Sequence, residues 1–237
     1  MLKMRIALQL KVKKLPIQYR MICLAFVKEM IRQSDEEMYN RLYDNVKKPK
    51  PLTYSIYMRN FKASQTHYEM EGATFIFSSS DPIIALAFIN SVSTIKKFEH
   101  QNVSIEIEHV RLVKEVVIRE QQAEFAILNA MLVEDVHGKP VLIDDENFET
   151  ELNHIMNAKF QYLYGRTLKQ PLKIVKYRLK KVVVKETNRH ANGKTLYYTG
   201  QKGRIVLNGH PEDLQNLYYD GIGLRTSSGW GTLEFIK

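Results

Sequence analysis

The chain opens with an alternating pattern, and a helical pattern follows it. Residues 4–13 alternate between apolar and polar side chains, which predicts a β-strand, and Pro16 interrupts the pattern. Residues 17–34 predict an amphipathic helix, and Asp35 can cap a second short helix over residues 36–42. The first helix has one stripe of apolar residues at helical spacing, formed by Met21, Leu24, Val27 and Ile31.

The remainder of the first half continues with extended segments around one more helix. Residues 52–61 and 73–78 predict two strands that can pair as a hairpin. Proline is favoured at the first helical position, so a helix is expected from Pro82 to about residue 92. A long strand over residues 103–117 follows. The order strand, helix, strand, strand, helix, strand is typical of a ferredoxin-like α+β domain.

The second half repeats this order imperfectly after the polar segment 119–122, where we expect a domain boundary. Asn192-Gly193 lies between two extended runs and is a strong hairpin signal. Pro211 begins the last predicted helix, which runs to about residue 219. The predicted strands are 125–133, 172–187, 195–207 and 232–236, and the predicted long helix covers residues 147–164.

Composition narrows the class of protein. A hydrophobic content of 44% is typical of a folded globular chain, and there is no uncharged apolar run long enough to span a membrane. The N-terminal segment does not resemble a signal peptide, so we expect a cytoplasmic protein that does not bind membranes. The single cysteine, Cys23, excludes an intrachain disulfide and a cysteine-based zinc cluster. A net charge of +9 favours polyanionic partners such as nucleic acid.

The most informative segment is a glycine-rich stretch near the C-terminus, residues 221–231 (GIGLRTSSGWG). Glycine permits a positive φ angle and close backbone approach, while N–H groups, hydroxyls and Arg225 can bind phosphate oxygens. A Rossmann loop is excluded because it runs from strand to helix, whereas this segment runs from helix to strand. The alternative is a tight structural connection in which glycines serve packing.

This glycine-rich stretch resembles the terminal motif of the RAMP superfamily of CRISPR proteins, and in particular its repeat-processing endoribonucleases. Four further segments resemble the same family along the chain. Residues 15–19 match its first strand-to-helix passage, and residues 50–55 match the approach to its second strand. Residues 77–82 and 144–148 match the starts of later helices. The resemblance therefore covers almost the whole sequence.

The resemblance implies an α+β fold with two tandem ferredoxin-like (RRM-like) domains, residues 1–120 and 121–237. It also implies cleavage of CRISPR repeat RNA without a metal or other cofactor, by attack of a 2′-hydroxyl that leaves 2′,3′-cyclic phosphate and 5′-hydroxyl ends. The implied partner is repeat RNA, with other CRISPR effector subunits and a second copy of the chain as further candidates. Two alternatives stay open: a non-catalytic RAMP subunit that binds RNA, and a general RNA-recognition module.

The expected catalytic residues depart from the family pattern. Many members have a histidine after the first helix, and Tyr43 occupies that place here. Lys28 and Arg32 share one helix face, so Lys28 is a candidate to stabilise the phosphorane or exchange protons. The predicted catalytic set is Lys28, Tyr43 and Lys50. His67 is the best spare histidine, and the seven histidines lack metal-ligand spacing.

A second basic feature is the strand segment from residue 173 to 185. In a strand, Lys176, Arg178 and Lys180 share one face with a two-residue period, opposite to Lys173. Such a face suits the phosphates of an RNA hairpin, although a solvated charge run is the alternative. The predicted RNA-binding residues are these three and Arg32, Lys47, Lys48, Gly221, Gly223, Arg225, Ser227, Gly229 and Gly231.

Overall fold

The computed structural model describes residues 3–44, 48–187 and 195–237. The chain forms two compact units. Most residues up to Lys114 belong to the first unit and most later residues to the second. Two segments are exchanged: Pro49–Thr53 belongs to the second unit, and the described residues of 185–196 belong to the first. No helix among the described residues is long and apolar enough to cross a membrane.

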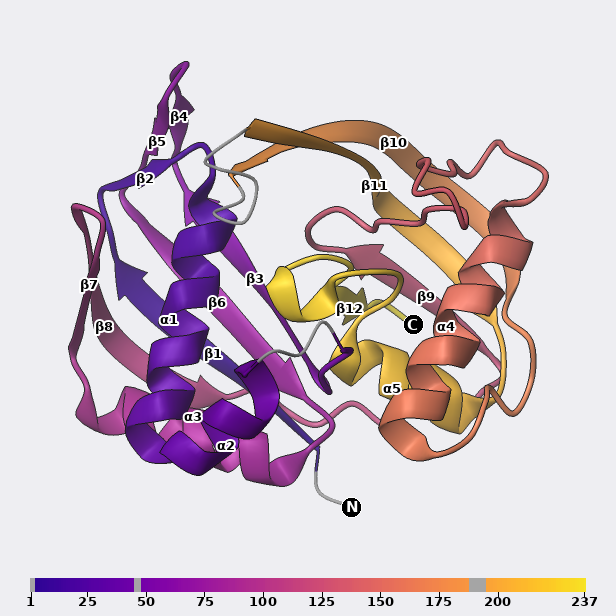
Figure 1. The fold of residues 1–237 in the computed structure, drawn as a ribbon, viewed down its shortest axis with the longest axis horizontal. Coiled ribbons are helices and arrows are strands. Elements are labelled where there is room, and N and C mark those ends of the chain that lie inside the picture. The colour runs from indigo at the N-terminus through magenta and orange to yellow at the C-terminus, as the bar shows by residue number, and fades with distance from the viewer. Residues whose placement is uncertain (1–2, 45–47, 188–194) are drawn as a thin grey trace. The chain divides into compact units, whose positions relative to one another are not determined.

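A five-stranded sheet with the order β3-β6-β1-β8-β7 is the centre of the first unit (Figure 1). β1 lies in the middle and pairs antiparallel with β6 on one side and β8 on the other. A small separate sheet has the order β2-β5-β4. The strands are β1 (Met4–Lys11), β2 (Lys14–Pro16), β3 (Leu52–Arg59), β4 (Lys62–Ala63), β5 (His67–Glu69), β6 (Gly72–Ser79), β7 (Lys97–His100) and β8 (Val103–Leu112).

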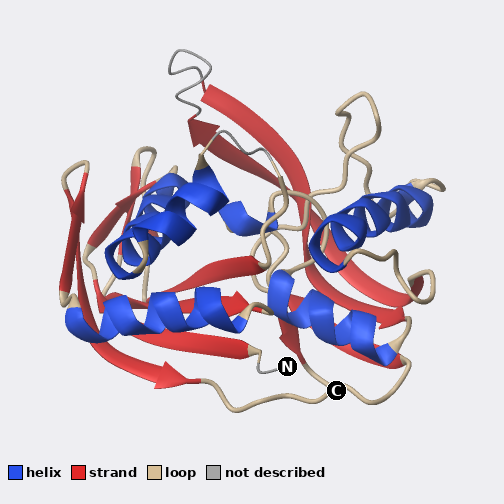
Figure 2. Cartoon of the chain, turned by 60° about the horizontal axis from the view of Figure 1, so that its bottom comes forward, coloured by secondary structure: helices blue, strands red, loops and turns tan. Residues whose placement is uncertain are grey.

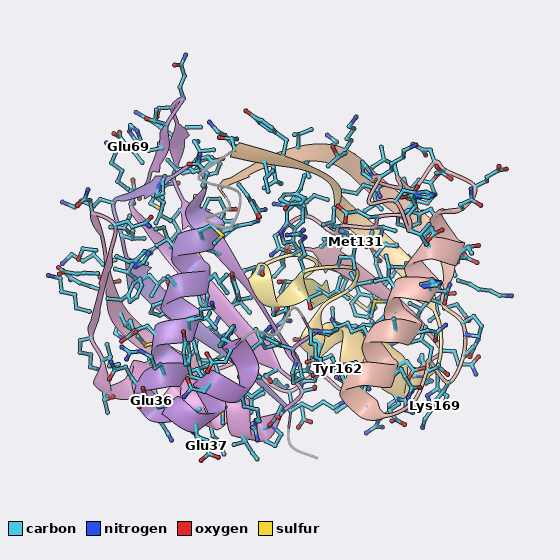
Figure 3. The ribbon with its side chains drawn as sticks, viewed as in Figure 1. Glu36, Glu37, Glu69, Met131, Tyr162 and Lys169 are labelled. Carbon is cyan, nitrogen blue, oxygen red and sulfur yellow. The ribbon has the colours of Figure 1, made fainter. Side chains whose placement is uncertain are left out.

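Three helices accompany this sheet: α1 (Tyr19–Ser34), α2 (Glu36–Tyr43) and α3 (Pro82–Thr94). α1 and α3 pack against each other, and α3 contacts β1, β6 and β8. The side chain of Asp35 accepts a hydrogen bond from the backbone N–H of Met38 and caps α2. Glu36 and Glu37, labelled in Figure 3, lie in the first turn of α2, where carboxylates suit the helix dipole.

Aromatic side chains hold α1 and α3 to the sheet. The ring of Phe26 on α1 lies edge-on to Phe75 and Phe98, with centroid distances of 5.4 Å and 5.3 Å. Phe88 on α3 stacks on Phe77 of β6 at 4.0 Å. Phe26 is buried, as are the other rings of this cluster, so its loss would leave a cavity in the centre of the unit.

The second unit has a four-stranded sheet with the order β10-β11-β9-β12. When its strands are numbered 1 to 4 along the chain, they lie side by side in the order 2-3-1-4. In the first unit β1, β3, β6 and β8, numbered in the same way, lie in that same order. In each unit, helices in blue accompany strands in red in Figure 2. The elements of the second unit are β9 (Gln122–Ile127), α4 (Phe148–Tyr164), β10 (Lys173–Thr187), β11 (Thr195–Asn208), α5 (Pro211–Asp220), a 3₁₀ turn (Thr226–Ser228) and β12 (Leu233–Phe235).

One hydrophobic cluster joins both helices of the second unit to its sheet. Phe125 of β9 and Leu207 of β11 lie in it with Met156 of α4 and Leu217 of α5. A smaller cluster surrounds Trp230 at the end of the glycine-rich segment, with Ala130, Leu132 and Val184 as its other buried members. The glycine-rich segment therefore has a hydrophobic support of its own.

The predicted α+β fold of tandem ferredoxin-like units is confirmed, with differences at particular elements. The strand expected over 103–117 ends at Leu112, and the strand expected over 125–133 is β9, which begins at Gln122 and ends at Ile127. The short strands β2, β4, β5 and β7 were not predicted, because their few residues carry no clear period, and Pro16, expected to interrupt the extended pattern, lies in β2. Asn192-Gly193 lies outside the described residues.

The predicted apolar stripe of α1 is partly wrong. Met21 and Leu24 are only half-buried, whereas Val27 and Ile31 are buried as expected. The buried face is centred on Phe26, because that ring enters the aromatic cluster. The buried residues of α1 are Ile22, Cys23, Phe26, Val27, Met30 and Ile31.

Replacing Phe26 by alanine should lower the free energy of unfolding by about 3–5 kcal/mol, because the cavity cannot be refilled by neighbouring rings. Tyr57 is 70% exposed, so Tyr57→Ala is the matched control and should change that free energy by less than about 0.5 kcal/mol. Urea unfolding followed by circular dichroism measures both. Equal losses in the two variants would contradict the assignment of the core.

Candidate RNA-binding and catalytic site

Two predicted catalytic residues meet where α1 and α2 pack together. The Nζ atom of Lys28 lies 4.6 Å from the centroid of the Tyr43 ring, a cation–π contact. Tyr39 lies one helical turn before Tyr43, with ring centroids 5.4 Å apart. The capped start of α2 and its short length fix this geometry, since Tyr43 is the last residue of the helix. The structure thus places a lysine directly on the residue that replaces the expected histidine.

Burial shifts the pKa of both groups, in opposite senses. Partial desolvation lowers the pKa of Lys28 from its ordinary value. Burial, with a smaller contribution from Tyr39, raises the pKa of Tyr43 far above its ordinary value. Tyr43 therefore keeps its proton at neutral pH and cannot act as a base, whereas the ammonium group of Lys28 loses its proton more easily than that of an exposed lysine.

Arg32 lies one turn after Lys28 but is already engaged. Its guanidinium donates hydrogen bonds to both carboxylate oxygens of Glu29 at 2.9–3.1 Å. These hydrogen bonds raise the pKa of Arg32. Burial is the largest single effect on Glu29 and raises its pKa, but the hydrogen bonds from Arg32 and Gln33 together outweigh it and lower that pKa. Because Glu29 offsets its charge, Arg32 offers a phosphate less attraction than a solitary arginine.

Lys28 and Arg32 line a groove of about 980 Å³ in the first unit, which we call the α1 groove. One wall is α1, and the other is formed by β7 and the turn after it. His100 lies on that second wall, with its ring stacked on Phe98 at 6.0 Å. Sequence reasoning dismissed His100 as a scattered histidine, because nothing in its local pattern predicts that β7 faces α1.

The basic segment after α2 is divided by the structure. Lys47 lies outside the described residues, and Lys48 is exposed. Lys50 is buried, with 8% of its surface exposed, and belongs to the second unit rather than to the unit of Lys28 and Tyr43. Thr53 in the same short segment shares a hydrogen bond of 2.8 Å with the hydroxyl of Thr232, just after the glycine-rich segment. The structure therefore does not group Lys50 with the other two residues.

His67 is held in the small sheet of the first unit. Its Nδ1 lies 3.0 Å from the hydroxyl of Ser64 and 2.9 Å from that of Thr66, and its Nε2 lies 3.0 Å from Oε1 of Glu69. Both ring nitrogens therefore have protein partners. These contacts are those of a histidine that fixes the local structure of a hairpin.

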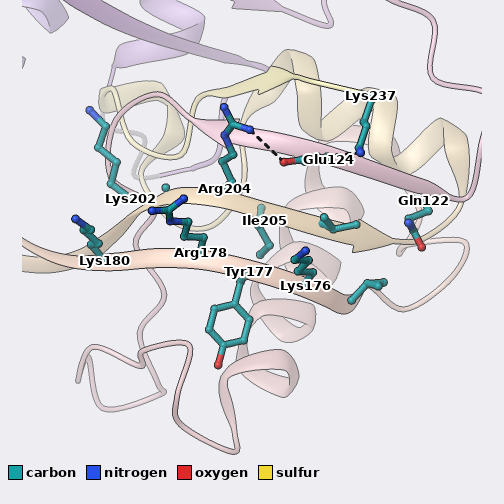
Figure 4. Close-up of a pocket in the computed structure, with 13 residues that line it drawn as sticks. Gln122, Glu124, Lys176, Tyr177, Arg178, Lys180, Lys202, Arg204, Ile205 and Lys237 are labelled. Carbon is teal, nitrogen blue, oxygen red and sulfur yellow. Dashed lines mark ion pairs between the residues drawn. The ribbon is translucent and has the colours of Figure 1, made fainter.

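The predicted basic face exists on the sheet of the second unit. Lys176, Arg178 and Lys180 project to the same side of β10, while Tyr177 projects to the other (Figure 4). They line a groove of about 900 Å³, which we call the sheet groove, together with residues of β9 and β11. Sequence reasoning did not assign three further cations to this groove: Lys202, Arg204 and Lys237.

Charge in the sheet groove is strongly positive. Among the described residues that line it, the one acid is Glu124, whose carboxylate lies 3.6 Å from Arg204 and 3.9 Å from Lys237. Gly203 permits the close approach of β11 to β10 here, because a Cβ atom at this position would lie 2.0 Å from the carbonyl oxygen of Arg178. Cations therefore outnumber carboxylates along this groove, and such a surface attracts anions.

The glycine-rich segment is a folded, largely buried loop. Gly223 and Gly231 have φ angles of 79° and 60°, and a Cβ atom would lie 2.5 Å and 1.8 Å from the nearest backbone oxygens. Their N–H groups bond within the protein: Gly223 to the sulfur of Met156, and Gly231 to the carbonyl of Ala130. The N–H groups of Gly221 and Gly229 are likewise bonded internally. These four glycines serve the fold of the loop.

Arg225 is the exposed residue of this loop. It adopts a left-handed conformation with φ of 57°, uncommon for a residue other than glycine. Its guanidinium carbon lies 4.3 Å from the centroid of the Tyr198 ring. Ser227 is half-buried in the 3₁₀ turn that follows. Of the residues predicted in this loop, Arg225 and Ser227 are the two that remain accessible to RNA.

Lys159 is the residue that sequence reasoning missed. It lies on α4, is 5% exposed, and its Nζ donates to the carbonyl oxygens of Asp220 and Gly221 at 2.7 Å and 3.0 Å and to the hydroxyl of Thr226 at 2.9 Å. Burial lowers its pKa to about 8, although Asp220 opposes that shift. One ammonium group thus holds the start and the middle of the glycine-rich loop.

Replacing Lys159 by methionine should lower the free energy of unfolding by about 3 kcal/mol at neutral pH, because three buried acceptors lose their donor. The wild type also has a distinct pH dependence. The pKa of Lys159 rises from about 8 in the folded chain to about 10.4 on unfolding. The unfolded chain therefore binds more protons in that window, and stability relative to Lys159→Met should rise with pH there.

Urea unfolding of both proteins at several pH values measures this difference. Lys176→Met, in which an exposed lysine of the sheet groove is replaced, is the matched control and should show neither the loss nor the pH dependence. If the difference in the free energy of unfolding between wild type and Lys159→Met stayed constant from neutral pH to above about pH 10, burial of the ammonium group would be contradicted.

Comparison with solved structures shows the same fold. The chain superposes on a structure described as a Cas6-related gene product from Pyrococcus furiosus with a TM-score of 0.86 and 17% identity, covering 99% of each chain. A structure described as an RAMP protein binding different RNA substrates gives 0.82 and 20%, covering 99% of this chain and 100% of the other. A Cas6 product complex gives 0.71 and 14%, with the same coverages. No curated protein matches the sequence significantly.

The sequence itself matches a family model. The model for the C-terminal part of the CRISPR-associated protein Cas6 matches residues 106–235, which is more than half of the chain. The matched region contains α4, the whole glycine-rich loop and every residue that lines the sheet groove except Lys237. The chain therefore belongs to the Cas6 family of CRISPR-associated RAMP proteins.

Proposed function

We propose that the protein is a metal-independent endoribonuclease that processes CRISPR repeat transcripts into guide RNAs. Membership of the Cas6 family supports the substrate, and the contact between Lys28 and Tyr43 is the observation that supports a reactive site. Among the described residues, no three His, Cys, Asp or Glu side chains are grouped so that they could hold a metal ion.

In the proposed reaction the ribose 2′-oxygen attacks the adjacent phosphorus while the bond from phosphorus to the 5′-oxygen breaks. The 2′-hydroxyl proton leaves to a base, and the departing 5′-oxygen gains a proton. The products are a 2′,3′-cyclic phosphate and a 5′-hydroxyl, and no water or metal is consumed. The protein must align the attack and stabilise negative charge on the phosphorane.

Lys28 is suited to the charged part of this task. Its ammonium group rests on the Tyr43 ring, which fixes its position, and its lowered pKa favours proton exchange. Tyr43, whose raised pKa keeps it protonated, acts as an orienting residue. Lys50 stays in the proposed set as its second cation, but it is buried.

Replacing Lys28 by alanine should lower the single-turnover cleavage rate of repeat RNA by about 100-fold or more, because the proton-exchanging cation is lost. Tyr43→Leu should have a similar effect, whereas Tyr43→Phe, which keeps the ring under Lys28, should retain more activity. Arg32→Ala and His67→Ala are the matched controls and should cut at rates near that of the wild type.

The same assay tests the reaction. Cleavage should persist in EDTA and should be absent when the nucleotide that supplies the attacking 2′-hydroxyl is replaced by its 2′-deoxy form. Cutting of the deoxy substrate would overturn the mechanism. Loss of activity in His67→Ala together with full activity in Lys28→Ala would overturn the residue assignment. His100→Ala would then test the histidine that lines the α1 groove.

A second candidate function is a non-catalytic RAMP subunit that binds RNA in a CRISPR effector complex. Two observations favour it: Tyr43 occupies the expected histidine's place, and one structure of similar fold is described as an RAMP protein that binds different RNA substrates. Tight binding of repeat RNA with no cleavage by the wild type would select this candidate. Both functions require an RNA surface, for which the sheet groove is the strongest candidate.

Replacing Lys176, Arg178 and Lys180 by alanine should weaken RNA binding and reduce its salt dependence. Each lost contact to a single-stranded phosphate should lower the slope of log affinity against log salt by about 0.7. The control is Lys173→Ala with Lys181→Ala, since both lysines are exposed on the same strand but do not line the groove. Equal slopes for the two variants, measured by fluorescence anisotropy, would exclude the groove from RNA binding.

A further inference from the structure

Arg225 is presented by a loop whose other residues are fixed. The N–H of Leu224, just before Arg225, donates to the carbonyl of Leu132, and the carbonyl of Arg225 accepts from the N–H of Ser228. Thr226, just after it, is buried and receives a hydrogen bond from Lys159. A positive φ angle at a non-glycine residue is uncommon and persists where the surroundings determine it. The loop therefore holds an exposed arginine in one place.

The guanidinium of Arg225 rests on an aromatic support. Tyr198 lies 4.3 Å beneath it, and the Tyr198 ring is edge-on to Trp230, with centroids 5.9 Å apart and planes at 75°. Trp230 is completely buried, so Tyr198 is backed by a rigid side chain. An arginine stacked in this way is pre-organised as a flat surface, and Arg225 is exposed to solvent.

The charge of Arg225 is partly offset on the protein side. Glu134 lies close enough for Arg225 to lower its pKa, against the larger effect of burial, which raises it. A nearby carboxylate weakens the attraction of an arginine for phosphate but leaves the face of its guanidinium available. Nucleobases stack on guanidinium planes in proteins that recognise unpaired RNA.

We propose that Arg225, supported by Tyr198 and Trp230, is a stacking site for one unpaired nucleobase of the bound RNA. This inference rests on the proposed binding of repeat RNA and adds a base contact to it. The site differs in kind from the sheet groove. The groove attracts phosphates whatever the base, whereas a stacked guanidinium requires that a base be present and unpaired.

The test is a set of synthetic repeat RNAs, each lacking the base at one unpaired position, and their affinities for the wild type and variants. For the wild type, one abasic position should weaken binding by about 5- to 100-fold, the range of one stacked base. Arg225→Lys keeps the charge but not the plane, so it should bind the intact and abasic RNAs equally. Tyr198→Leu should behave in the same way, and Tyr198→Phe, which keeps the ring, should behave as the wild type.

The outcomes separate this inference from the proposed function. If repeat RNA binds but no abasic position matters beyond a small change, or if Arg225→Lys discriminates as the wild type does, the stacking site is refuted while RNA binding stands. If repeat RNA does not bind the wild type at all, the proposed function itself fails. Circular dichroism and the thermal unfolding midpoint of each variant verify that the loop variants remain folded.

Discussion

The arrangement of the glycine-rich loop depends on one buried charge, the ammonium group of Lys159. Removing an ammonium group from water is costly unless donors and acceptors are matched, and here three oxygens match its three donors. Two of these oxygens are backbone carbonyls at the end of α5, which have no partner within the helix. The same interaction thus ends a helix and starts a loop. Through Thr226 it also holds the residue next to Arg225.

The glycines and Lys159 act together on the backbone. Glycine allows the chain to turn with positive φ angles and to pass within contact distance of Leu132 and Ile222. A bulky replacement at Gly223 is therefore expected to disturb folding as much as RNA binding, because its Cβ would overlap a backbone oxygen. Arg225 is different, since its side chain is exposed and makes no hydrogen bond that holds the loop closed. The glycines of this motif set the conformation of the loop, whereas Arg225 presents an exposed charge.

The elements of the fold could be predicted from sequence more fully than the site. Long periodic segments such as α1 and β10 were found because their patterns are local, and the shared face of Lys176, Arg178 and Lys180 follows from strand geometry alone. The role of Lys159 could not be predicted, because a lysine in a helical pattern is normally solvated and its acceptors lie about 60 residues later in the chain. The stripe of α1 was misplaced because Phe26 dominates packing through its size, a tertiary effect that spacing does not reveal.

Net charge also says little about which cations are free to bind RNA. The excess of positive charge in the sequence is +9, yet Arg32 is engaged with Glu29, Lys11 with Glu106, and Arg166 with Asp213. In the sheet groove, by contrast, one carboxylate faces six cations. Exposed ion pairs contribute little to stability, but they lower the local potential that a phosphate meets. Among the described residues of the second unit, cations outnumber carboxylates along the sheet groove, so the local potential there favours a phosphate.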